Sequence, residues 1–260
     1  MPDEGNIFSV IVAVLNQAGV LEQCIQSVVS QTYTHKELIV MDGGSTDGSL
    51  SILEANARHI AYWESKPDRG VYHAWNKALA QARGNWICFL GADDYFWNEH
   101  VLENLIPHLE RATLKGLRIV YGRVGRVRKD GRLIRLHGKP WGKIRWLMAH
   151  GMPLVHAGIM HHSSLFQDHG AFDESFRIAG DYECLLRELK TARALFAEGV
   201  CTVAHREGGM SDTDKLLTCR EIARARRIHG LPRFSWVWSL VYLRALLQAV
   251  YKSIRRGPKH

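Results

Sequence analysis

The chain has 260 residues, with 34 Lys and Arg against 26 Asp and Glu, which gives a formal charge of +8 and a pI near 9.4. With 46% hydrophobic and 23% charged residues, the composition is that of a globular protein and excludes intrinsic disorder, collagen-like repeats and a disulfide scaffold. The five cysteines lie far apart without a CxxC pair, which indicates free thiols in a reducing, cytoplasmic compartment. Residues 1–6 are acidic and do not resemble a signal peptide.

The positive charge is concentrated in two segments. Residues 111–145 hold twelve Lys or Arg against Asp130 alone, and residues 215–260 hold eleven against Glu221 alone. Such a surface attracts an anionic partner, and the charge by itself leaves open a phosphate-bearing substrate, anionic lipid or nucleic acid.

Along the chain, apolar runs alternate with stretches of helical spacing. Buried strands are predicted at residues 8–15, 37–41, 60–64, 86–90 and 117–121. Helices are predicted between them at residues 20–31, 49–58, 71–83 and 101–111. This order predicts an α/β fold, with a mixed, mostly parallel sheet covered by helices on both faces. In such folds ligands bind beyond the carboxyl ends of the strands.

Acidic residues follow two of the predicted strands. Strand 37–41 runs into Asp42 and a Gly-Gly turn, and strand 86–90 runs into Gly91, Ala92, Asp93 and Asp94. Carboxylates at such positions can hold a ribose or base, and an adjacent pair suits a divalent metal that carries phosphate oxygens. Each motif alone is also typical of a turn or a helix cap, but their placement at two strand ends favours a ligand site. GxxxxGK[ST] and GxGxxG motifs are missing, which argues against P-loop and dinucleotide chemistry.

Six segments, in this order over roughly residues 7–212, resemble the motifs of family 2 glycosyltransferases: SVIVAVLN, ELIVMDGGSTDGS, KPDRGVYHAWNKAL, GNWICFLGADDYF, FDESFRIAGDYECLLR and HREGGMS. The resemblance implies a GT-A fold with a Rossmann-like nucleotide-binding half and an acceptor-binding half. It also implies an inverting hexosyltransferase that uses Mg or Mn. The donor would be a nucleotide diphosphate sugar, with uridine diphosphate the commonest nucleotide in the family.

The resemblance assigns donor-site roles position by position. Asn16 and Asp42 match the contacts to base and ribose, Asp94 matches the metal ligand of the DXD-type motif, and Asp93 matches a contact to the ribose or donor sugar. The loop that flanks the nucleotide and the helix after it are matched by Lys66, Asp68, Arg69, Gly70, Tyr72, Asn76 and Lys77. The chain departs from the family in reading YHAWNK where many relatives read YDAMNK, and in having Gly91 where some have an acidic residue. These departures affect the local contacts and the affinity for metal.

Asp181 matches the general base of the family, which takes a proton from the acceptor hydroxyl. Glu183 is a nearby competitor for this role, and Asp181 could also simply cap a helix at residues 182–190. The resemblance places His205 and Arg206 near the diphosphate, and we expect His156 to line the acceptor pocket or bind diphosphate.

We expect three parts in the chain: residues 1–122 as the nucleotide-sugar-binding half, residues 123–212 as the acceptor half, and residues 213–260 as a basic, helical extension. A Lys-Asp-Gly turn between alternating runs predicts a basic hairpin within residues 123–143. The apolar, aromatic segment 234–251 is short for a membrane span, and its spacing favours a helix in the membrane interface. Its apolar stripe comprises Trp236, Leu240, Leu243 and Leu247. The alternative is a helix packed on the protein's own core.

These features predict a peripheral protein on the cytoplasmic membrane surface. Its acceptor would be a saccharide, with a polyprenyl-phosphate-linked one a natural partner, in cell-surface polysaccharide assembly. Two other functions compete: a basic protein that binds nucleic acid or membrane, and a nucleotide-sugar-binding protein without transferase activity. Helix-turn-helix, zinc-finger and RNP signatures are missing, so we do not expect nucleic acid as a partner.

Overall fold

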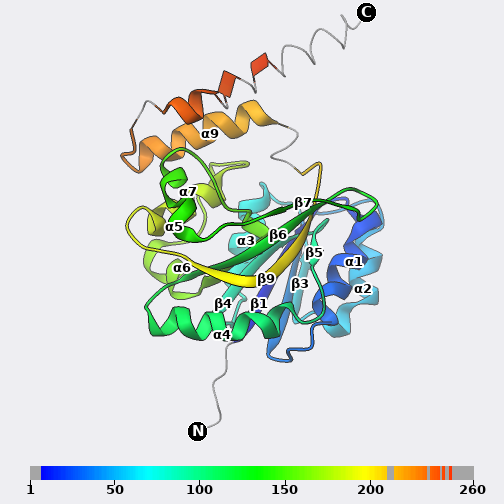
Figure 1. Cartoon of the computed structure of the whole chain (residues 1–260). Helices are drawn as coiled ribbons and strands as arrows, with labels where there is room; N and C mark the ends of the chain where they lie inside the picture. Colours follow the sequence, from blue (N-terminus) through cyan, green and yellow to red (C-terminus); the bar gives the residue numbers. More distant parts are fainter. Residues whose placement is uncertain (1–6, 210–213, 233–234, 241, 244–245, 248–260) are drawn as a thin grey trace, which may run out of the picture.

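The computed structural model describes residues 7–209, 214–232, 235–240, 242–243 and 246–247 of the chain (Figure 1). The strands are β1 (Phe8–Val14), β2 (Lys36–Asp42), β3 (Tyr62–Ser65), β4 (Trp86–Gly91), β5 (Tyr95–Phe96), β6 (Ile119–Val127), β7 (Leu133–His137), β8 (Ile159–His162) and β9 (Leu195–Arg206). The α-helices are α1 (Ala18–Val29), α2 (Ser49–Ala55), α3 (Val71–Leu79), α4 (Val101–Leu114), α5 (Trp141–Ile144), α6 (Ser164–His169), α7 (Gly180–Leu189) and α9 (Lys215–Ile228). Short 3-10 helices are η1 (Ala57–His59), η2 (Arg145–Ala149) and η3 (His156–Gly158).

The strands form one mixed sheet in the order β3-β2-β1-β4-β8-β6-β9-β5, with β7 paired to the edge of β6. β1, β2, β3 and β4 are parallel, and β8 is antiparallel to both β4 and β6, so β6 and its parallel neighbour β9 run in the same direction as β4. Six strands therefore end at the same edge of the sheet, which confirms the predicted mostly parallel arrangement. The expected boundary between residues 122 and 123 lies inside β6, so the two halves share this sheet.

Helices cover both faces of the sheet because its central strands are apolar on both sides. Along β1, Phe8, Val10 and Val12 pack with residues of α1, α2 and α4, while Ile11 packs on the other face with residues of α3, α6 and α7. Burial of each such side chain contributes about 1.5–3 kcal/mol. The two apolar faces hold the strand ends, and thus the loops after them, in fixed positions.

The predicted elements agree with the structure in type, and their ends differ. The helix predicted at residues 49–58 is interrupted at Asn56, whose side-chain amide donates to the carbonyl of Ile52 (2.9 Å) and to Glu22 (2.8 Å). The strand β8 was not predicted, because its sequence IMHH has two polar residues and no alternation. The expected hairpin is present as β6 and β7, with Gly131 in the left-handed region at its turn (φ 84°).

The C-terminal region lies over α7. Figure 1 shows α9 beside α5 and α7, at the opposite end of the fold from α4. The predicted helix 234–251 lies partly outside the described residues; within them, residues 236–240 are helical and Trp238 donates to the carbonyl of Cys219 on α9 (3.2 Å). The predicted apolar stripe is exposed: Trp236 61%, Leu240 60%, Leu243 51% and Leu247 61%. Among the described residues, no helix is long and apolar enough to cross a membrane.

Candidate functional site

The loops after β1 and β2 are fastened to each other. Asn16 has a left-handed backbone (φ 53°), which asparagine tolerates better than most residues, and its side-chain oxygen accepts from the Thr46 amide (2.8 Å). Its own amide donates to the Ser45 hydroxyl (2.8 Å). Asn16 therefore holds the 42–49 loop in place at the carboxyl edge of the sheet.

Asp42 is fully buried, and its loop surrounds it with donors. Its carboxylate accepts from the amides of Gly44 (3.2 Å) and Ser45 (3.0 Å), from the Ser45 hydroxyl, and from the Ser65 hydroxyl at the end of β3 (2.6 Å). These contacts fix the turn and tie it to β3. The structure thus gives Asp42 a bracing role, and the expected contact to base or ribose stays a prediction.

An ion-pair network continues this edge from β3 into α3. Asp68 contacts His73 (3.0 Å) and Lys77 (3.2 Å), and Glu64 pairs with Lys77 (2.9 Å) and with the exposed Lys66 (2.7 Å). An added Cβ on Gly43 would lie 3.2 Å from an Asp68 oxygen, so the two loops are in close contact.

The other predicted residues of this segment join α3 to the loop before α7. Arg69 pairs with Glu174 (2.5 Å), and the side chain of Asn76 both donates to the carbonyl of Phe172 and accepts from its amide (each 2.9 Å). Gly70, with φ 140°, precedes α3 and allows the turn. Arg69 and Asn76 therefore brace the loop that leads toward Asp181.

Asp94, His205 and Arg206 meet where β4 and β9 end. Asp94 is 3% exposed, lies within 3.0 Å and 3.1 Å of His205 Nδ1 through its two oxygens, and accepts from the Arg206 amide (3.0 Å). Burial lowers the pKa of His205, but the hydrogen bond and negative charge of Asp94 outweigh it, and the pKa is raised overall. Asp94 is therefore already paired with His205, whose imidazole favours its protonated, positively charged form.

Asp93 is the more open carboxylate of the two. Burial, reinforced by the charge of Asp94, raises its pKa, and no side chain of the described residues pairs with it closely enough to reverse the shift. A Cβ added to Gly91 would lie 2.9 Å from an oxygen of each aspartate, so both carboxylates turn back over this glycine. Carboxylate oxygens are the hard donors that Mg²⁺ and Mn²⁺ prefer, but the described residues contain no group of three or more His, Cys, Asp or Glu side chains placed to hold a metal ion by themselves.

Part of the Arg206 guanidinium has no hydrogen-bond partner among the described residues. Its planar group lies 5.3 Å above the ring of Tyr95 and one nitrogen donates to Gln23, but Nε and Nη1 are buried without a hydrogen-bond partner there. Because buried donors are normally satisfied, these two are available to a bound anion.

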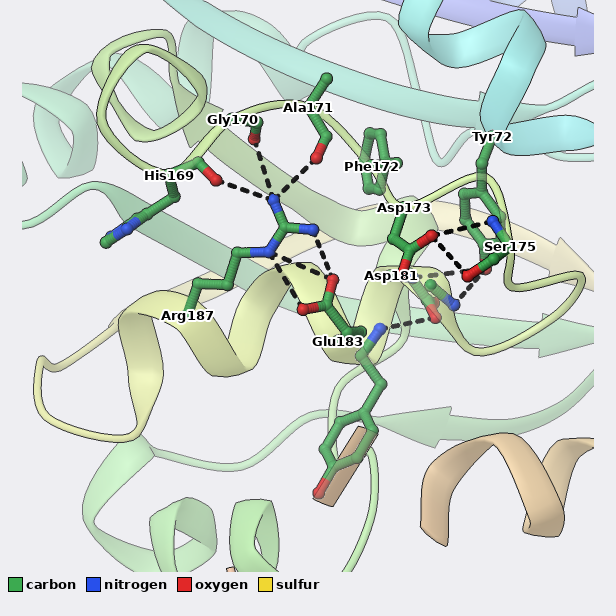
Figure 2. A network of polar contacts seen from close by, with 12 residues as sticks. Tyr72, His169, Gly170, Ala171, Phe172, Asp173, Ser175, Asp181, Glu183 and Arg187 are labelled. Atoms are coloured by element: carbon green, nitrogen blue, oxygen red, sulfur yellow. Dashed lines mark hydrogen bonds and ion pairs between the residues drawn. The ribbon is translucent and has the colours of Figure 1, made fainter. Parts of the chain in front are cut away.

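Asp181 lies in the first turn of α7, beside α3 (Figure 2). The Tyr72 hydroxyl accepts from the amides of Gly180 (2.8 Å) and Asp181 (3.3 Å) and donates to the carbonyl of Ile178 (2.6 Å). The carboxylate of Asp181 accepts from the Tyr182 amide (2.7 Å). Burial raises the pKa of Asp181 to about 6, although the hydrogen bonds oppose the shift. The competitor Glu183 instead pairs with Arg187 (2.5 Å) and His229 (2.9 Å).

His156 lies in an aromatic cluster. His156 stacks on Trp75 (5.0 Å between centroids) and Phe89 (5.5 Å), and His161 is fully buried beside them. Burial lowers the pKa of His156 well below its usual value, so its ring is neutral. Among the described residues, His156 makes no hydrogen bond to the aspartates above, and its expected acceptor or diphosphate contact stays a prediction.

A family model for glycosyl transferase family 2 matches residues 9–172. The chain is a family 2 glycosyltransferase. The relatives include a glycosyltransferase of PGL/p-HBAD biosynthesis from Mycobacterium tuberculosis, 30% identical over 70% of this chain and 69% of the relative. A Bacillus subtilis glycosyltransferase named for teichuronic acid biosynthesis is 35% identical over 40% of this chain and 42% of its own length.

Solved structures that are similar to this glycosyltransferase confirm the GT-A fold. Staphylococcus aureus TarS in complex with UDP has a TM-score of 0.66 at 18% identity, and covers 92% of this chain and 70% of that structure. A mannosyltransferase of Pyrobaculum calidifontis, in complex with GDP-Man and Mn²⁺, has a TM-score of 0.65 at 16% identity, and covers 100% and 78%.

Two polar groups of the site region were not given a role by the sequence. The Tyr72 hydroxyl was only matched to a helix, and Glu221 on α9, which contacts the loop before Asp181, was noted only as the single acid of a basic segment. The sequence feature that could have identified Glu221 is that it is the single acidic residue in a segment with eleven Lys and Arg.

Proposed function

We propose that this glycosyltransferase moves a hexosyl group from a nucleoside diphosphate sugar to a hydroxyl of a saccharide or lipid-linked saccharide. The observation that carries the proposal is that two carboxylates are incompletely neutralised: Asp93 in the loop after β4 and Asp181 in the first turn of α7. Both have raised pKa values, the first through burial and the charge of Asp94 and the second through burial. Such groups are typical of sites that receive a cation or a proton.

Asp181 acts as the general base in this proposal. As the acceptor oxygen forms a bond to the anomeric carbon, the bond from that carbon to the diphosphate breaks, and the hydroxyl proton moves to the Asp181 carboxylate. With a pKa of about 6, Asp181 is mostly ionised at neutral pH yet remains basic enough to take the proton. Tyr72 keeps the start of α7, and with it this carboxylate, in place.

Charge on the leaving diphosphate is met where β4 and β9 end. Arg206 has unused donors, and His205 is held as a cation-favouring group against Asp94. Asp93 and Asp94 would hold Mg²⁺ or Mn²⁺ through their carboxylate oxygens. When bound, such an ion supplies Lewis-acid stabilisation of the departing phosphate oxygens.

The neighbours support the donor class. TarS binds UDP and UDP-GlcNAc, and the Pyrobaculum enzyme binds GDP-Man with Mn²⁺. The relatives named for PGL/p-HBAD and teichuronic acid biosynthesis support an acceptor in cell-surface glycan or glycolipid assembly.

A thermal-shift panel with UDP, GDP, dTDP and CDP, each with and without Mn²⁺, tests the donor site. A ligand at 100 times its Kd adds about 2.7 kcal/mol to the stability of the folded state. We expect one diphosphate to raise the Tm with metal only, and Asp93→Asn and Asp94→Asn to abolish the rise. Glu110→Gln, which neutralises an exposed carboxylate on α4, is the matched control and should keep it. Stabilisation by random RNA and by none of the diphosphates would overturn the proposal.

Two exposed surfaces support action at a membrane. On the edge strand β7, Leu133, Ile134 and Leu136 are 44–49% exposed among arginines, and the C-terminal stripe of Trp236, Leu240, Leu243 and Leu247 is more than half exposed. Apolar side chains beside Lys and Arg suit an anionic lipid surface, where each basic residue contributes about 1 kcal/mol. We therefore place the enzyme peripherally on the cytoplasmic face of the membrane.

Flotation with vesicles tests this placement. We expect the protein to bind vesicles that contain about 30% anionic lipid and to bind them more weakly at high salt. Truncation of the chain after Gly230 should abolish binding. Equal flotation of the truncated chain and of a Leu133→Ser, Leu136→Ser double variant would remove both surfaces from the proposal.

A further inference from the structure

The loop that leads into Asp181 is held by one carboxylate from α9. Glu221 accepts from three successive backbone amides, those of Arg177 (2.8 Å), Ile178 (2.8 Å) and Ala179 (2.9 Å). The side chain is 7% exposed. Three successive N–H groups that end two residues before the general base, the last of them buried, thus depend on a residue 42 to 44 positions further along the chain.

The same loop is anchored at its other end by α7. Arg187 donates to the carbonyls of His169 (2.8 Å), Gly170 (3.2 Å) and Ala171 (2.7 Å) while Glu183 holds its guanidinium, as Figure 2 shows. Arg187 thus binds the carbonyls at the start of the loop, and Glu221 binds the amides at its end.

α9 adds a second contact between these two anchors. Arg224 donates to the hydroxyl (2.5 Å) and the carbonyl (3.1 Å) of Ser175, and its guanidinium lies 4.2 Å from the ring centre of Phe176. Residues 175–179 are therefore bound to α9 by both backbone and side chains.

The lone acid of the C-terminal segment is the one that makes these bonds. Residues 215–260 contain eleven Lys or Arg, and Glu221 is the single acidic residue among them. Neither a basic nor an apolar side chain at this position could accept from the three amides.

We propose that Glu221 is a positioning residue for Asp181: it fixes the backbone of residues 177–179 and so sets where the carboxylate meets the acceptor hydroxyl. The proposal rests on the proposed role of Asp181 as general base. It makes α9, which lies beyond the 9–172 family match, part of the catalytic geometry.

The charge of Glu221 also reaches Asp181. Besides burial, the dominant cause, the Glu221 charge raises the pKa of Asp181, and the hydrogen bonds from the Tyr182 amide and the Tyr72 side chain lower it. The titratable groups that face Asp181 are thus Tyr72 from α3, Glu221 from α9 and Cys184 on α7 itself. Neutralising Glu221 should therefore move the acid limb of the rate profile to lower pH.

Glu221→Gln, which keeps the shape but replaces one acceptor oxygen by an amide NH₂, tests the proposal. The readout is release of the nucleoside diphosphate from the donor that the thermal-shift panel identifies, with water in place of the acceptor hydroxyl. We expect kcat to fall about 10- to 100-fold with donor KM within about twofold, since only the base is displaced. Amide hydrogen exchange should become faster at residues 177–181.

Glu188→Gln is the matched control. Glu188 is a buried carboxylate later in α7 that pairs with Arg118 and His169 and makes no contact with residues 177–179 among the described contacts. We expect this variant to lose stability and to keep kcat, the pH profile and exchange at 177–181. If kcat falls equally in both variants, Glu221 acts only through the stability of the fold. This result would overturn the proposal.

Failure of the proposal differs from failure of the underlying function. If Asp181→Asn keeps wild-type turnover, the base assignment is wrong whatever Glu221 does. If Asp181→Asn is inactive but Glu221→Gln has wild-type kcat and exchange, the base stands and Glu221 does not position it.

Discussion

Asp181 destabilises the folded state when it is ionised, and its replacement should reveal the size of this effect. Its pKa rises from 3.8 to about 6 on folding because the carboxyl is buried. Each pKa unit corresponds to 1.36 kcal/mol, so a shift of about 2 units costs the folded state up to about 3 kcal/mol when the group is ionised. The side chain keeps some exposure, which lowers the figure, and we expect about 2 kcal/mol.

The sign of the pH dependence follows from the direction of this shift. The folded state binds the proton more tightly than the unfolded state, so the group is not destabilising below pH 3.8. The destabilisation develops as the pH rises from 3.8 through about 6 and is constant above about pH 7. This differs from a salt-bridged aspartate, whose contribution disappears as the pH falls.

Asp181→Asn should therefore be more stable than the wild type and inactive. Asparagine keeps an oxygen for the Tyr182 amide but cannot ionise. At pH 7.5 we expect a Tm higher by about 4–8 °C, at about 2–4 °C per kcal/mol, and nearly equal Tm values at pH 4. Differential scanning calorimetry of both proteins at pH 4, 5, 6 and 7.5 measures the gap. A gap that does not change with pH, or a less stable variant at pH 7.5, would refute the reasoning.

Four other substitutions test the packing of the site and of the sheet that supports it. Gly91→Ala places a Cβ 2.9 Å from both aspartates, so we expect the metal-dependent Tm shift with nucleotide to disappear while the Tm without ligand changes little. Gly84→Ala places a Cβ 2.6 Å from the Ile7 carbonyl and the Ser9 amide and should cost about 2–3 kcal/mol in urea unfolding, whereas Gly19→Ala, with open space on α1, should be neutral or stabilising. Asp42→Asn weakens the fully buried carboxylate's bonds to its loop and should cost about 2 kcal/mol and reduce nucleotide binding; an unchanged urea midpoint would contradict the bracing role.

The strands could be predicted because most of them are buried on both faces. An uninterrupted apolar run such as that of β4 has few structural alternatives in a globular chain, and the same holds for β1. β8 is buried as well, but it was missed because two of its four residues are histidines. Its His161 is fully buried, with Nδ1 3.3 Å from the carbonyl of Ile87, so a polar residue is part of the core.

The sequence groups the candidate residues where they are contiguous, and it does not show which side chains of distant elements bond to them. The turn after β2 and the acid pair after β4 are each contiguous in sequence. The partner of Asp94 comes from β9, and that of the 177–179 loop from α9, because tertiary packing alone brings these segments together. Periodicity contains no information on such pairs, so Glu221 was seen only as an anomaly of charge.

The four predicted aspartates are alike in sequence logic and differ in the donors that the fold gives them. The loop provides Asp42 with three donors and β3 with a fourth, and β9 provides Asp94 with an imidazole and an amide. Asp93 and Asp181 keep raised pKa values because burial outweighs the donors that they have. An ionised carboxylate in that state is relieved by a cation or a proton, whereas a satisfied one gains little from either. We infer that the acceptor proton arrives at Asp181, that the donor-bound metal is held at Asp93 with Asp94 beside it, and that Asp42 fixes the loop framework around them.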